Sequence, residues 1–256
     1  MNAEQRQAGI VAAVMRDGRV HVNELAVHYD VTVETIRRDL SVLDRAGALR
    51  KVHGGAVPAP VSAAPETGVA ERELTAAPAK AAIAAVALEA LDLRGGMSLL
   101  LDAGTTTAAL ARLLPTGADL RVVTNSVLIA SVLAARQGTT LRVLGGQVRG
   151  ITQAAVGPEA LEALARLRVD VAVLGTNGIS ADHGLSTPDP DEAAVKRAMV
   201  RAGRRVIALA DAAKIGQEHL VSFADTADID LLVTNASLPE ALAAQLADTG
   251  TEVRTA

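Results

Sequence analysis

Residues 32–40 read TVETIRRDL, and this stretch decides the fold of the amino-terminal part of the chain. The preceding residues predict a turn, and Thr32 can cap a helix because its hydroxyl accepts a bond from a free backbone N–H. A helix is expected over 33–46, with Gly47 as its stop. Its apolar side chains are three and four residues apart, so they share one face and are expected to be buried: Ile36, Leu40 and Leu43.

Two further helices and a hairpin are predicted around this segment. Apolar periodicity indicates a helix over 3–16 and a shorter one that ends at Tyr29, with extended residues between them. Residues 48–57 are typical of a β-hairpin, with two glycines at its turn or exit. Three helices followed by a hairpin predict a winged helix-turn-helix DNA-binding domain over residues 1–57, whose third helix enters the major groove.

The outer face of the 33–46 helix and the hairpin carry groups that bind DNA. Arginine bonds to guanine or clamps a phosphate, and hydroxyl groups reach base edges or phosphate oxygens. Between Val33 and His53, five Arg/Lys stand against three Asp/Glu. The predicted partner is double-stranded operator DNA, and the predicted contacts are Thr32, Thr35, Arg37, Arg38, Ser41, Arg50, Lys51 and His53.

Charge alone leaves an alternative open for this face. Arg37 and Arg38 can instead form a solvated helix surface that is paired with Glu34 and Asp39. The net charge of the whole chain, −4, argues weakly against nucleic acid. Residues 1–57, however, hold eight Lys/Arg and seven Asp/Glu, or +1, whereas the remainder holds 17 and 22, or −5. The predicted DNA-binding domain is therefore near neutral, whereas the rest of the chain is acidic. Such a domain can bind DNA if its positive charge lies on one face.

The composition excludes several classes of protein. The chain of 256 residues is long enough for two unequal domains, and no apolar run approaches the roughly 20 residues of a membrane span. The amino terminus lacks a secretory segment, so a cytoplasmic protein without membrane association is expected. There is no cysteine and the five histidines are scattered, so neither a metal site nor a cofactor is predicted. With one Tyr and one Phe, the core must be aliphatic.

A second domain is predicted over residues 79–256, after a linker at 58–78 that is rich in Pro, Ala and Ser. Residues 71–73 can already begin that domain. Apolar strands alternate there with Ala/Leu-rich helices, which predicts a doubly wound α/β domain with a parallel sheet covered on both faces. The expected strands are 97–101, 120–123, 141–144, 169–174, 205–210, 229–233 and 252–255.

Polar residues follow several of these strands, and the carboxyl ends of parallel strands meet at one edge of a sheet. A glycine before a helix start exposes free N–H groups that suit a phosphate, and Lys214 can supply a cation. Glu192 can lie over sugar hydroxyls. A polyhydroxylated, phosphorylated ligand is therefore expected at Asp102, Gly104, Thr105, Thr106, Thr107, Asn125, Gly175, Thr176, Asn177, Gly178, Glu192 and Lys214.

Each of these features has a simpler interpretation when it is taken alone. The Gly104–Thr107 stretch can be an ordinary capped helix start, and Lys214 can be a solvated loop lysine. Glu192 and Lys196 stand four residues apart, which is the spacing of an ordinary surface pair worth about 0.3–0.5 kcal/mol. The functional interpretation rests on several polar loops that converge at one edge.

Two matched stretches at the expected separation resemble the DeoR/GlpR family of bacterial repressors. They are residues 32–40, preceded by Arg6, Ile10 and Val14, and the hairpin LRKVHGGA at 49–56. The resemblance covers nearly the whole chain. It implies that Asp39 supports the head rather than contacting DNA. It also implies that the second domain is similar to ribose-5-phosphate isomerase and binds a phosphorylated sugar, with Lys196 in the site. Ala79, Ala213 and Asn235 depart from the family pattern.

The resemblance implies a repressor of a sugar-metabolism operon that a phosphorylated sugar relieves. Residues 145–153 and 174–190 look most like actinobacterial regulators of fructose use, so fructose 1-phosphate is the expected effector. A homo-oligomer, dimer or tetramer, is expected because one small head contacts few phosphates. The alternative is a sugar-phosphate isomerase with an accessory head, in which Glu192 is a general base and Lys214 stabilises an oxyanion. The DNA-reading helix, which an isomerase does not need, argues against an enzyme.

Overall fold

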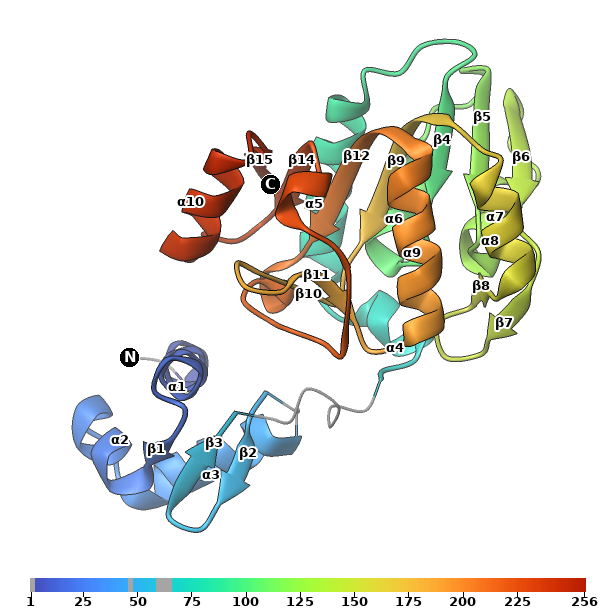
Figure 1. The fold of residues 1–256 in the computed structure, drawn as a ribbon. Helices are drawn as coiled ribbons and strands as arrows, with labels where there is room; N and C mark the ends of the chain where they lie inside the picture. The colour runs from blue at the N-terminus through green and yellow to red at the C-terminus, as the bar shows by residue number, and fades with distance from the viewer. Residues whose placement is uncertain (1–2, 46–47, 59–65) are drawn as a thin grey trace. The chain divides into compact units, whose positions relative to one another are not determined.

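A computed structural model describes residues 3–45, 48–58 and 66–256 of the chain. The chain divides into two compact units, Met1–Glu66 and Thr67–Ala256, and Figure 1 shows the elements of each. The first unit is a winged helix-turn-helix and the second is a parallel α/β domain, as the sequence predicts.

Three helices and a small antiparallel sheet build the first unit, which we call the head. The sheet has the strand order β1-β3-β2. The third helix was expected to end at Ala46 and Gly47, which lie outside the described residues. The elements are α1 (Ala3–Asp17), β1 (Val20–His21), α2 (Val22–Tyr29), α3 (Val33–Arg45), β2 (Arg50–Val52) and β3 (Gly55–Val57).

The helices of the head pack through one aliphatic cluster. Ile36 and Leu40 of α3 are fully buried beside Ile10 and Val14 of α1. The predicted cap of α3 is present, since the Thr32 hydroxyl accepts a bond from the Thr35 N–H at 3.1 Å. The apolar spacing of α3 therefore fixes which face turns inward and which is left for a partner.

A glycine pair shapes the hairpin that forms the wing. Gly54 has a φ of +77°, a backbone conformation that favours glycine, and it forms the turn between β2 and β3. A Cβ on Gly55 would lie 1.9 Å from the carbonyl oxygen of Val20. Gly55 thus lets β3 approach β1, and the pair joins the wing to the helices.

A seven-stranded parallel sheet with the order β15-β14-β12-β9-β4-β5-β6 is the centre of the second unit. All seven strands that the sequence predicts are present, with shifts of a few residues at their ends. They are β4 (Ser98–Leu101), β5 (Leu120–Thr124), β6 (Thr139–Val143), β9 (Val169–Gly175), β12 (Gly203–Ala210), β14 (Leu231–Thr234) and β15 (Glu252–Thr255).

Helices cover both faces of this sheet, which confirms the doubly wound prediction (Figure 1). Strand side chains alternate between the faces: Leu99 and Leu101 join one buried cluster and Leu100 joins the other. One face packs against α5 (Ala77–Leu91), α6 (Thr105–Leu113) and α7 (Val127–Leu133), and the other against α8 (Pro158–Ala165), α9 (Pro190–Ala202) and α10 (Glu240–Asp248).

Shorter elements, none of them predicted, lie outside the parallel sheet. They form a two-stranded ribbon, a three-stranded antiparallel sheet and two 3-10 turns. They are β7 (Gln147–Arg149), β8 (Ala154–Val156), β10 (Gly178–Ser180), β11 (Gly184–Thr187), β13 (Val221–Ala224), η1 (Ala212–Lys214) and η2 (Thr226–Asp228).

The structure differs from the expected linker at 58–78 over its second part. A helix, α4 (Val69–Leu74), lies within it, and α5 begins at Ala77. Val69 is buried, and its N–H donates to the carbonyl oxygen of Ile151 at 2.9 Å. Pro78, one of the prolines that suggested a linker, stands in the first turn of α5, where proline is favoured. In the described part of the chain, no helix is long and apolar enough to cross a membrane.

Candidate DNA interface and ligand site

The predicted DNA-contacting residues lie on α3 and the wing. Arg38 is exposed, and so are Arg50, Lys51 and His53. Arg37 pairs with Glu34 at 3.8 Å, but both side chains are more than half exposed, so this pair holds the arginine weakly. The pairing with Glu34 that the solvated-surface interpretation expects is therefore present, whereas Asp39 pairs with Arg6, and both Arg37 and Arg38 are exposed.

Hydrogen bonds connect the wing to the outer face of α3. The Lys51 ammonium donates to the Ser41 hydroxyl at 2.9 Å, and the Lys51 N–H donates to a carboxylate oxygen of Asp44 at 2.9 Å. The Ser41 hydroxyl also donates to the Arg37 carbonyl. These bonds therefore hold Lys51 of the wing against α3. The hydroxyls of Thr32 and Thr35 are 2.9 Å apart at the start of α3.

Asp39 lies on the opposite, buried side of α3. Its carboxylate accepts bonds from Arg6 Nε at 2.7 Å and from Gln7 Nε2 at 2.8 Å. It is 4 % exposed. The supporting role that the resemblance implies for Asp39 is therefore confirmed, because this ion pair ties α1 to α3.

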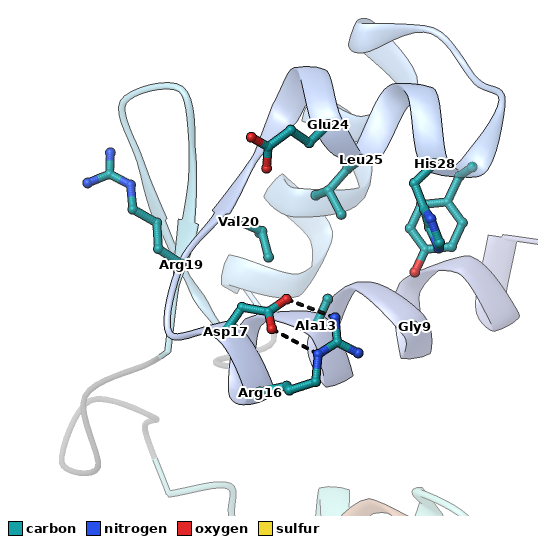
Figure 2. A pocket seen from close by; sticks show the side chains of 10 residues that line it. Gly9, Ala13, Arg16, Asp17, Arg19, Val20, Glu24, Leu25 and His28 are labelled. Carbon is teal, nitrogen blue, oxygen red and sulfur yellow. Dashed lines mark hydrogen bonds and ion pairs between the residues drawn. The ribbon is translucent and has the colours of Figure 1, made fainter.

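Figure 2 shows a pocket of the head between α1, β1 and α2. Arg16 and Asp17 form an exposed ion pair beside it. None of the predicted DNA-contacting residues lines this pocket. Its lining residues are Gly9, Ala13, Arg16, Asp17, Arg19, Val20, Glu24, Leu25, His28 and Tyr29.

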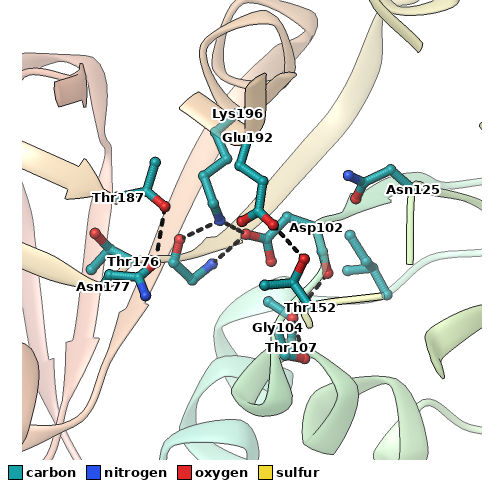
Figure 3. A network of polar contacts seen from close by, with 12 residues as sticks. Asp102, Gly104, Thr107, Asn125, Thr152, Thr176, Asn177, Thr187, Glu192 and Lys196 are labelled. Carbon is teal, nitrogen blue, oxygen red and sulfur yellow. Dashed lines mark hydrogen bonds and ion pairs between the residues drawn. The ribbon is translucent and has the colours of Figure 1, made fainter. Parts of the chain in front are cut away.

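A buried ion pair lies at the carboxyl edge of the parallel sheet (Figure 3). Asp102 follows β4, and one of its oxygens, Oδ2, accepts from Lys196 Nζ of α9 and from the Gly175 N–H at 3.0 Å. Lys196 Nζ also donates to the Gly175 carbonyl at 2.9 Å. Three predicted residues thus connect the end of β4, the end of β9 and the helix α9.

Glu192, one turn before Lys196, lies in a second charged cluster. Its Oε1 accepts from Arg149 of β7 and from the Thr152 hydroxyl. Arg149 also pairs with Asp189 at 3.2 Å, and Asp189 caps α9 through the Glu192 N–H. Glu192 and Lys196 are both buried, so they are not the exposed surface pair that was the simpler interpretation.

The predicted phosphate loop is the buried start of α6. Gly104 is its N-cap, and Thr105 and Thr106 form its first turn. Free N–H groups at a helix start favour an anion. The Thr107 hydroxyl donates to the carbonyl oxygens of Asp102 at 3.0 Å and Gly104 at 2.9 Å, which gives it a local role in shaping the loop.

The glycine loop after β9 lies beside this cluster and is internally bonded. The Thr176 hydroxyl donates to the carbonyl oxygens of Gly178 and Ser186. Asn177 Oδ1 accepts from the Thr187 hydroxyl at 3.1 Å. A Cβ on Gly178 would lie 2.3 Å from the Gln217 carbonyl, so the close approach requires glycine. Thr176 and Gly178 therefore shape the site rather than offer free groups to it.

Lys214 lies apart from the ion pairs, on η1 after β12, and is partly exposed. Its charged neighbour is Lys80 of α5. Burial lowers the pKa of Lys80, and the nearby Lys214 and Arg72 lower it further, while Asp211 opposes the shift. Lys80 Nζ donates to the carbonyl oxygens of Arg72 and Thr75 at the end of α4. Three cations thus gather near η1.

Asn125 directly follows β5, and it lies on the side of Asp102 that is opposite to Thr176 and Asn177 (Figure 3). Its Nδ2 donates to the Ala155 carbonyl at 3.0 Å. A small cavity separates Asn125 from α9. Its lining residues are Asp102, Ala103, Asn125, Ala154, Glu192 and Lys196.

The sequence did not indicate Arg149, Thr152 or Lys80 as site residues. Arg149 lies 43 residues before Glu192 in the chain, so no local spacing connects the pair. Lys80 is a single cation in the Ala-rich sequence of α5, and this pattern alone does not indicate a binding site. Asn235, a departure from the family pattern, accepts from the Ala212 N–H at 2.9 Å and so holds η1 with an amide oxygen.

Comparison with known proteins gives the same two-part organisation. A family described as "DeoR-like helix-turn-helix domain" matches residues 6–59, and one described as "DeoR C terminal sensor domain" matches residues 75–236. The HTH-type transcriptional regulator GlpR of Haloferax volcanii is 36% identical over 92% of this chain and 91% of its own length. The glycerol-3-phosphate regulon repressor of Escherichia coli K12 is 32% identical over 97% of each chain.

Among solved structures, ribose 5-phosphate isomerase A of Methanocaldococcus jannaschii is 15% identical over 53% of this chain and 52% of its own, with a TM-score of 0.37. This likeness carries no argument about activity. The relatives that align along nearly the full chain are transcriptional regulators, not enzymes. The chain is a DNA-binding transcriptional regulator and belongs to the DeoR family.

Proposed function

We propose that this protein represses an operon for sugar metabolism and that a phosphorylated sugar, with fructose 1-phosphate as the first candidate, relieves the repression. The observation that carries the proposal is the convergence of buried charged and hydroxyl side chains at the carboxyl edge of the parallel sheet. This sheet belongs to the second unit, which we call the sensor unit. Asp102, Glu192 and Lys196 are each at least nine-tenths buried there. Burying several charges is costly, which favours a functional use for them.

Operator binding is assigned to the outer face of α3 and the wing. Arg37 and Arg38 are proposed to contact base edges or phosphates, and the hydroxyls of Thr32, Thr35 and Ser41 are proposed to assist them. The wing residues Arg50, Lys51 and His53 add phosphate contacts. The bonds from Lys51 to α3 support this assignment, because they hold Lys51 of the wing against α3.

The phosphate of the effector is assigned to the start of α6 and the cations near η1. The N–H groups of Thr105 and Thr106 offer partial positive charge, their hydroxyls offer further hydrogen-bond donors, and Lys214 offers a full positive charge. Lys80 and Arg72 raise the positive potential near Lys214. Arg72 supports the assignment further: within the described residues, its buried Nε and Nη2 have no hydrogen-bond partner.

Two heads are proposed to bind two half-sites, so the working form is a homo-oligomer. One head contacts few phosphates, and linking two heads raises the effective concentration of the second. An effector on the sensor unit then acts by changing the free energy of binding at a distant site. Such a coupling is typically worth about 1–3 kcal/mol and is reciprocal.

The helix α4 offers a physical route for this coupling. It follows the segment that joins the units, and its Val69 N–H is bonded to Ile151. The next residue, Thr152, donates to Glu192 in the proposed site. At the other end of α4, the carbonyl oxygens of Arg72 and Thr75 accept from Lys80. Rearrangement of Glu192 or Lys80 around a ligand would therefore move the first helix after the joining segment.

The test is a titration of DNA-bound protein. The DNA is a fragment that the full chain selects from a random pool. Fructose 1-phosphate, fructose 6-phosphate and glycerol 3-phosphate are compared with fructose and glycerol. Release by a phosphorylated member, weakened in Lys214→Ala and Thr105→Ala variants that still bind DNA, is the expected result. Equal release by the unphosphorylated parents would overturn the phosphate assignment.

A further inference from the structure

Two oxygen atoms in the sensor site are buried without a protein partner. Within the described residues, Asp102 Oδ1 and Asn125 Oδ1 have no hydrogen-bond donor, although the two residues are only 1 % and 4 % exposed. A buried polar atom without a partner is costly, and native proteins hold few of them. Both residues line the same cavity, next to Glu192 and Lys196.

The identity of the free atom on Asn125 follows from its neighbour. Its amide nitrogen donates to the Ala155 carbonyl at 3.0 Å. The reverse orientation would place two acceptor oxygens against each other, so the hydrogen-bond network identifies the oxygen as the unpartnered atom of this cavity-lining residue. Asp102 has the same arrangement, because Oδ2 accepts from Lys196 and Gly175 and Oδ1 is left over. The cavity therefore presents two acceptors.

Charge and size restrict what this cavity can hold. Two carboxylates line it, and its one cation, Lys196, already donates to Asp102 and to the Gly175 carbonyl. A phosphate would meet acceptors and negative charge here. The volume is about 10 Å³, which suits about one water molecule or one hydroxyl group. A group that donates hydrogen bonds fits both restrictions, and an anion fits neither.

We propose that the cavity between Asp102 and Asn125 binds a hydroxyl group of the effector and rejects its phosphate. The inference rests on the proposed function and fixes the direction in which the ligand lies: the hydroxyl-bearing end points at Asp102 and Asn125, and the phosphate lies elsewhere on the edge. Asp102 is thereby removed from the predicted phosphate loop. A phosphate ester that lacks hydroxyls leaves both oxygens unpaired, so it binds weakly.

The experiment compares ligands with and without hydroxyls on the full chain. Affinities of fructose 1-phosphate, fructose 6-phosphate, glycerol 3-phosphate, propyl phosphate, fructose and glycerol are measured by calorimetry on wild type and on Asn125→Ala. The tightest hydroxylated ester is expected to exceed propyl phosphate by about tenfold or more in wild type, because a site built for a hydroxyl penalises its absence. In Asn125→Ala this ratio falls by about tenfold, while propyl phosphate binds as before.

A matched control is available in the sheet. The Thr139 hydroxyl, at the start of β6, is also buried without a partner among the described residues, but it does not line the cavity. Thr139→Ala removes an unpartnered buried oxygen that lies away from the site. The ratio of the affinities for the hydroxylated ester and propyl phosphate should therefore equal that of wild type. Since Asn125→Ala also removes a bond to Ala155, it can fail to fold, and a second variant is needed.

That second variant is Ala154→Ser, which places a hydroxyl donor on a residue that lines the cavity. If the free oxygens need donors, this variant raises the thermal unfolding temperature and lowers the affinity for the hydroxylated ester. A substitution that only disturbs packing lowers both. Opposite directions of the two changes therefore support the proposal, and a fall in both overturns it.

The remaining outcomes separate this inference from the proposed function. If the ratio of the affinity for the hydroxylated ester to the affinity for propyl phosphate is the same in folded Asn125→Ala as in wild type, then only water bonds to the two oxygens. That result overturns the inference. Binding by fructose or glycerol but by no phosphate ester overturns the effector class, whereas loss of that binding in Asn125→Ala still supports the cavity assignment. Failure of every probe to bind wild type overturns both.

Discussion

Asp102 and Lys196 form a buried ion pair that joins the end of β4 to α9 in the sensor unit. Their side chains are 1% and 8% exposed. Taking two charges out of water is expensive unless each is also hydrogen-bonded. Gly175 meets this need, because its N–H donates to Asp102 and its carbonyl accepts from Lys196. The pair therefore positions the strand ends that form the proposed site.

Lys196→Met should destabilise the sensor unit strongly, since it leaves the Asp102 carboxylate buried without its cation. The expected loss in the free energy of unfolding is about 3–5 kcal/mol, measured by urea denaturation. The control is Arg254→Ala, which breaks an ion pair whose side chains are 40% and 48% exposed and should cost no more than about 1 kcal/mol. Similar losses in the two variants would show that burial does not decide the effect.

Operator binding should fall when the arginines of α3 are removed. Arg37→Ala and Arg38→Ala should each cost about 1–3 kcal/mol if the residue reads a base. A residue that contacts only phosphate should instead lower the salt dependence of binding by about one unit. Band-shift titrations at several salt concentrations measure both. Arg16→Ala, an arginine paired with Asp17 beside the pocket of the head, is the matched charge control. Wild-type affinity in the folded double variant would contradict the assignment.

The sequence predicts those parts of the molecule that local patterns determine. Continuous Val, Leu and Ile runs gave all seven parallel strands, and the spacing of Ile36 and Leu40 gave the buried face of α3. The four-residue spacing of Glu192 and Lys196 placed them on one helix face but could not name their partners. Those partners lie 43 and 94 residues away, and only the folded sheet brings them together.

A second limit concerns the loops beyond the strands. The sequence predicted that Lys214, which follows a strand, and Glu192, which lies on a helix, converge at one edge of the sheet. In the structure Lys214 has Lys80 as a charged neighbour, and it does not line the small cavity beside Glu192. Strand order decides how far apart such loops lie: Lys214 follows β12, Asn125 follows β5, and two strands separate β12 from β5 in the sheet. Strand order cannot be obtained from apolar runs.

Stability of the sensor unit should fall in acid through Asp170. The Ser98 hydroxyl donates to this carboxylate at 2.6 Å and the Ser98 N–H at 2.9 Å, and these bonds lower the pKa of Asp170. A lowered pKa in the folded state means that the unfolded chain takes up the proton first. The stabilisation is therefore complete above the unfolded pKa, about 3.9, and is lost as pH falls through the folded value.

Asp170→Asn and Ser98→Ala test this pH dependence. Both should be less stable than wild type near neutral pH and should lose less stability on acidification, because the contact between carboxylate and hydroxyl is already gone. Denaturation curves collected from about pH 6 to pH 3 give the slopes. Acid slopes as steep as that of wild type in both variants would mean that other carboxylates carry the acid sensitivity.

The protein should associate in solution. Multi-angle light scattering at micromolar concentration should give a mass of at least twice 26.2 kDa. If only the DNA-bound protein reaches that mass, then DNA drives the association. A single 26.2 kDa species with and without DNA would contradict the two-head mode of binding.

The last prediction concerns the N–H of Val69 in α4, which donates to the carbonyl oxygen of Ile151 at 2.9 Å. Val69 is the first residue of α4, where proline is tolerated because that N–H has no partner inside the helix. Gly68 has a ψ of 152°, the extended conformation that a residue before proline adopts. Val69→Pro therefore removes one hydrogen bond while it keeps the helix. Val69→Ala is the control, because it shortens the buried side chain and retains the N–H.

Effector affinity of the free protein should change little in Val69→Pro, since the cavity residues are untouched. The effector-induced fall in DNA affinity, typically about 5- to 150-fold for coupled sites, should shrink toward no effect in Val69→Pro and persist in Val69→Ala. Paired titrations of DNA affinity with and without saturating fructose 1-phosphate measure this factor. Coupling is reciprocal, so effector affinity measured with and without DNA must change by the same factor. An equal, undiminished factor in both variants would show that the signal reaches the head without the bond from α4 to Ile151.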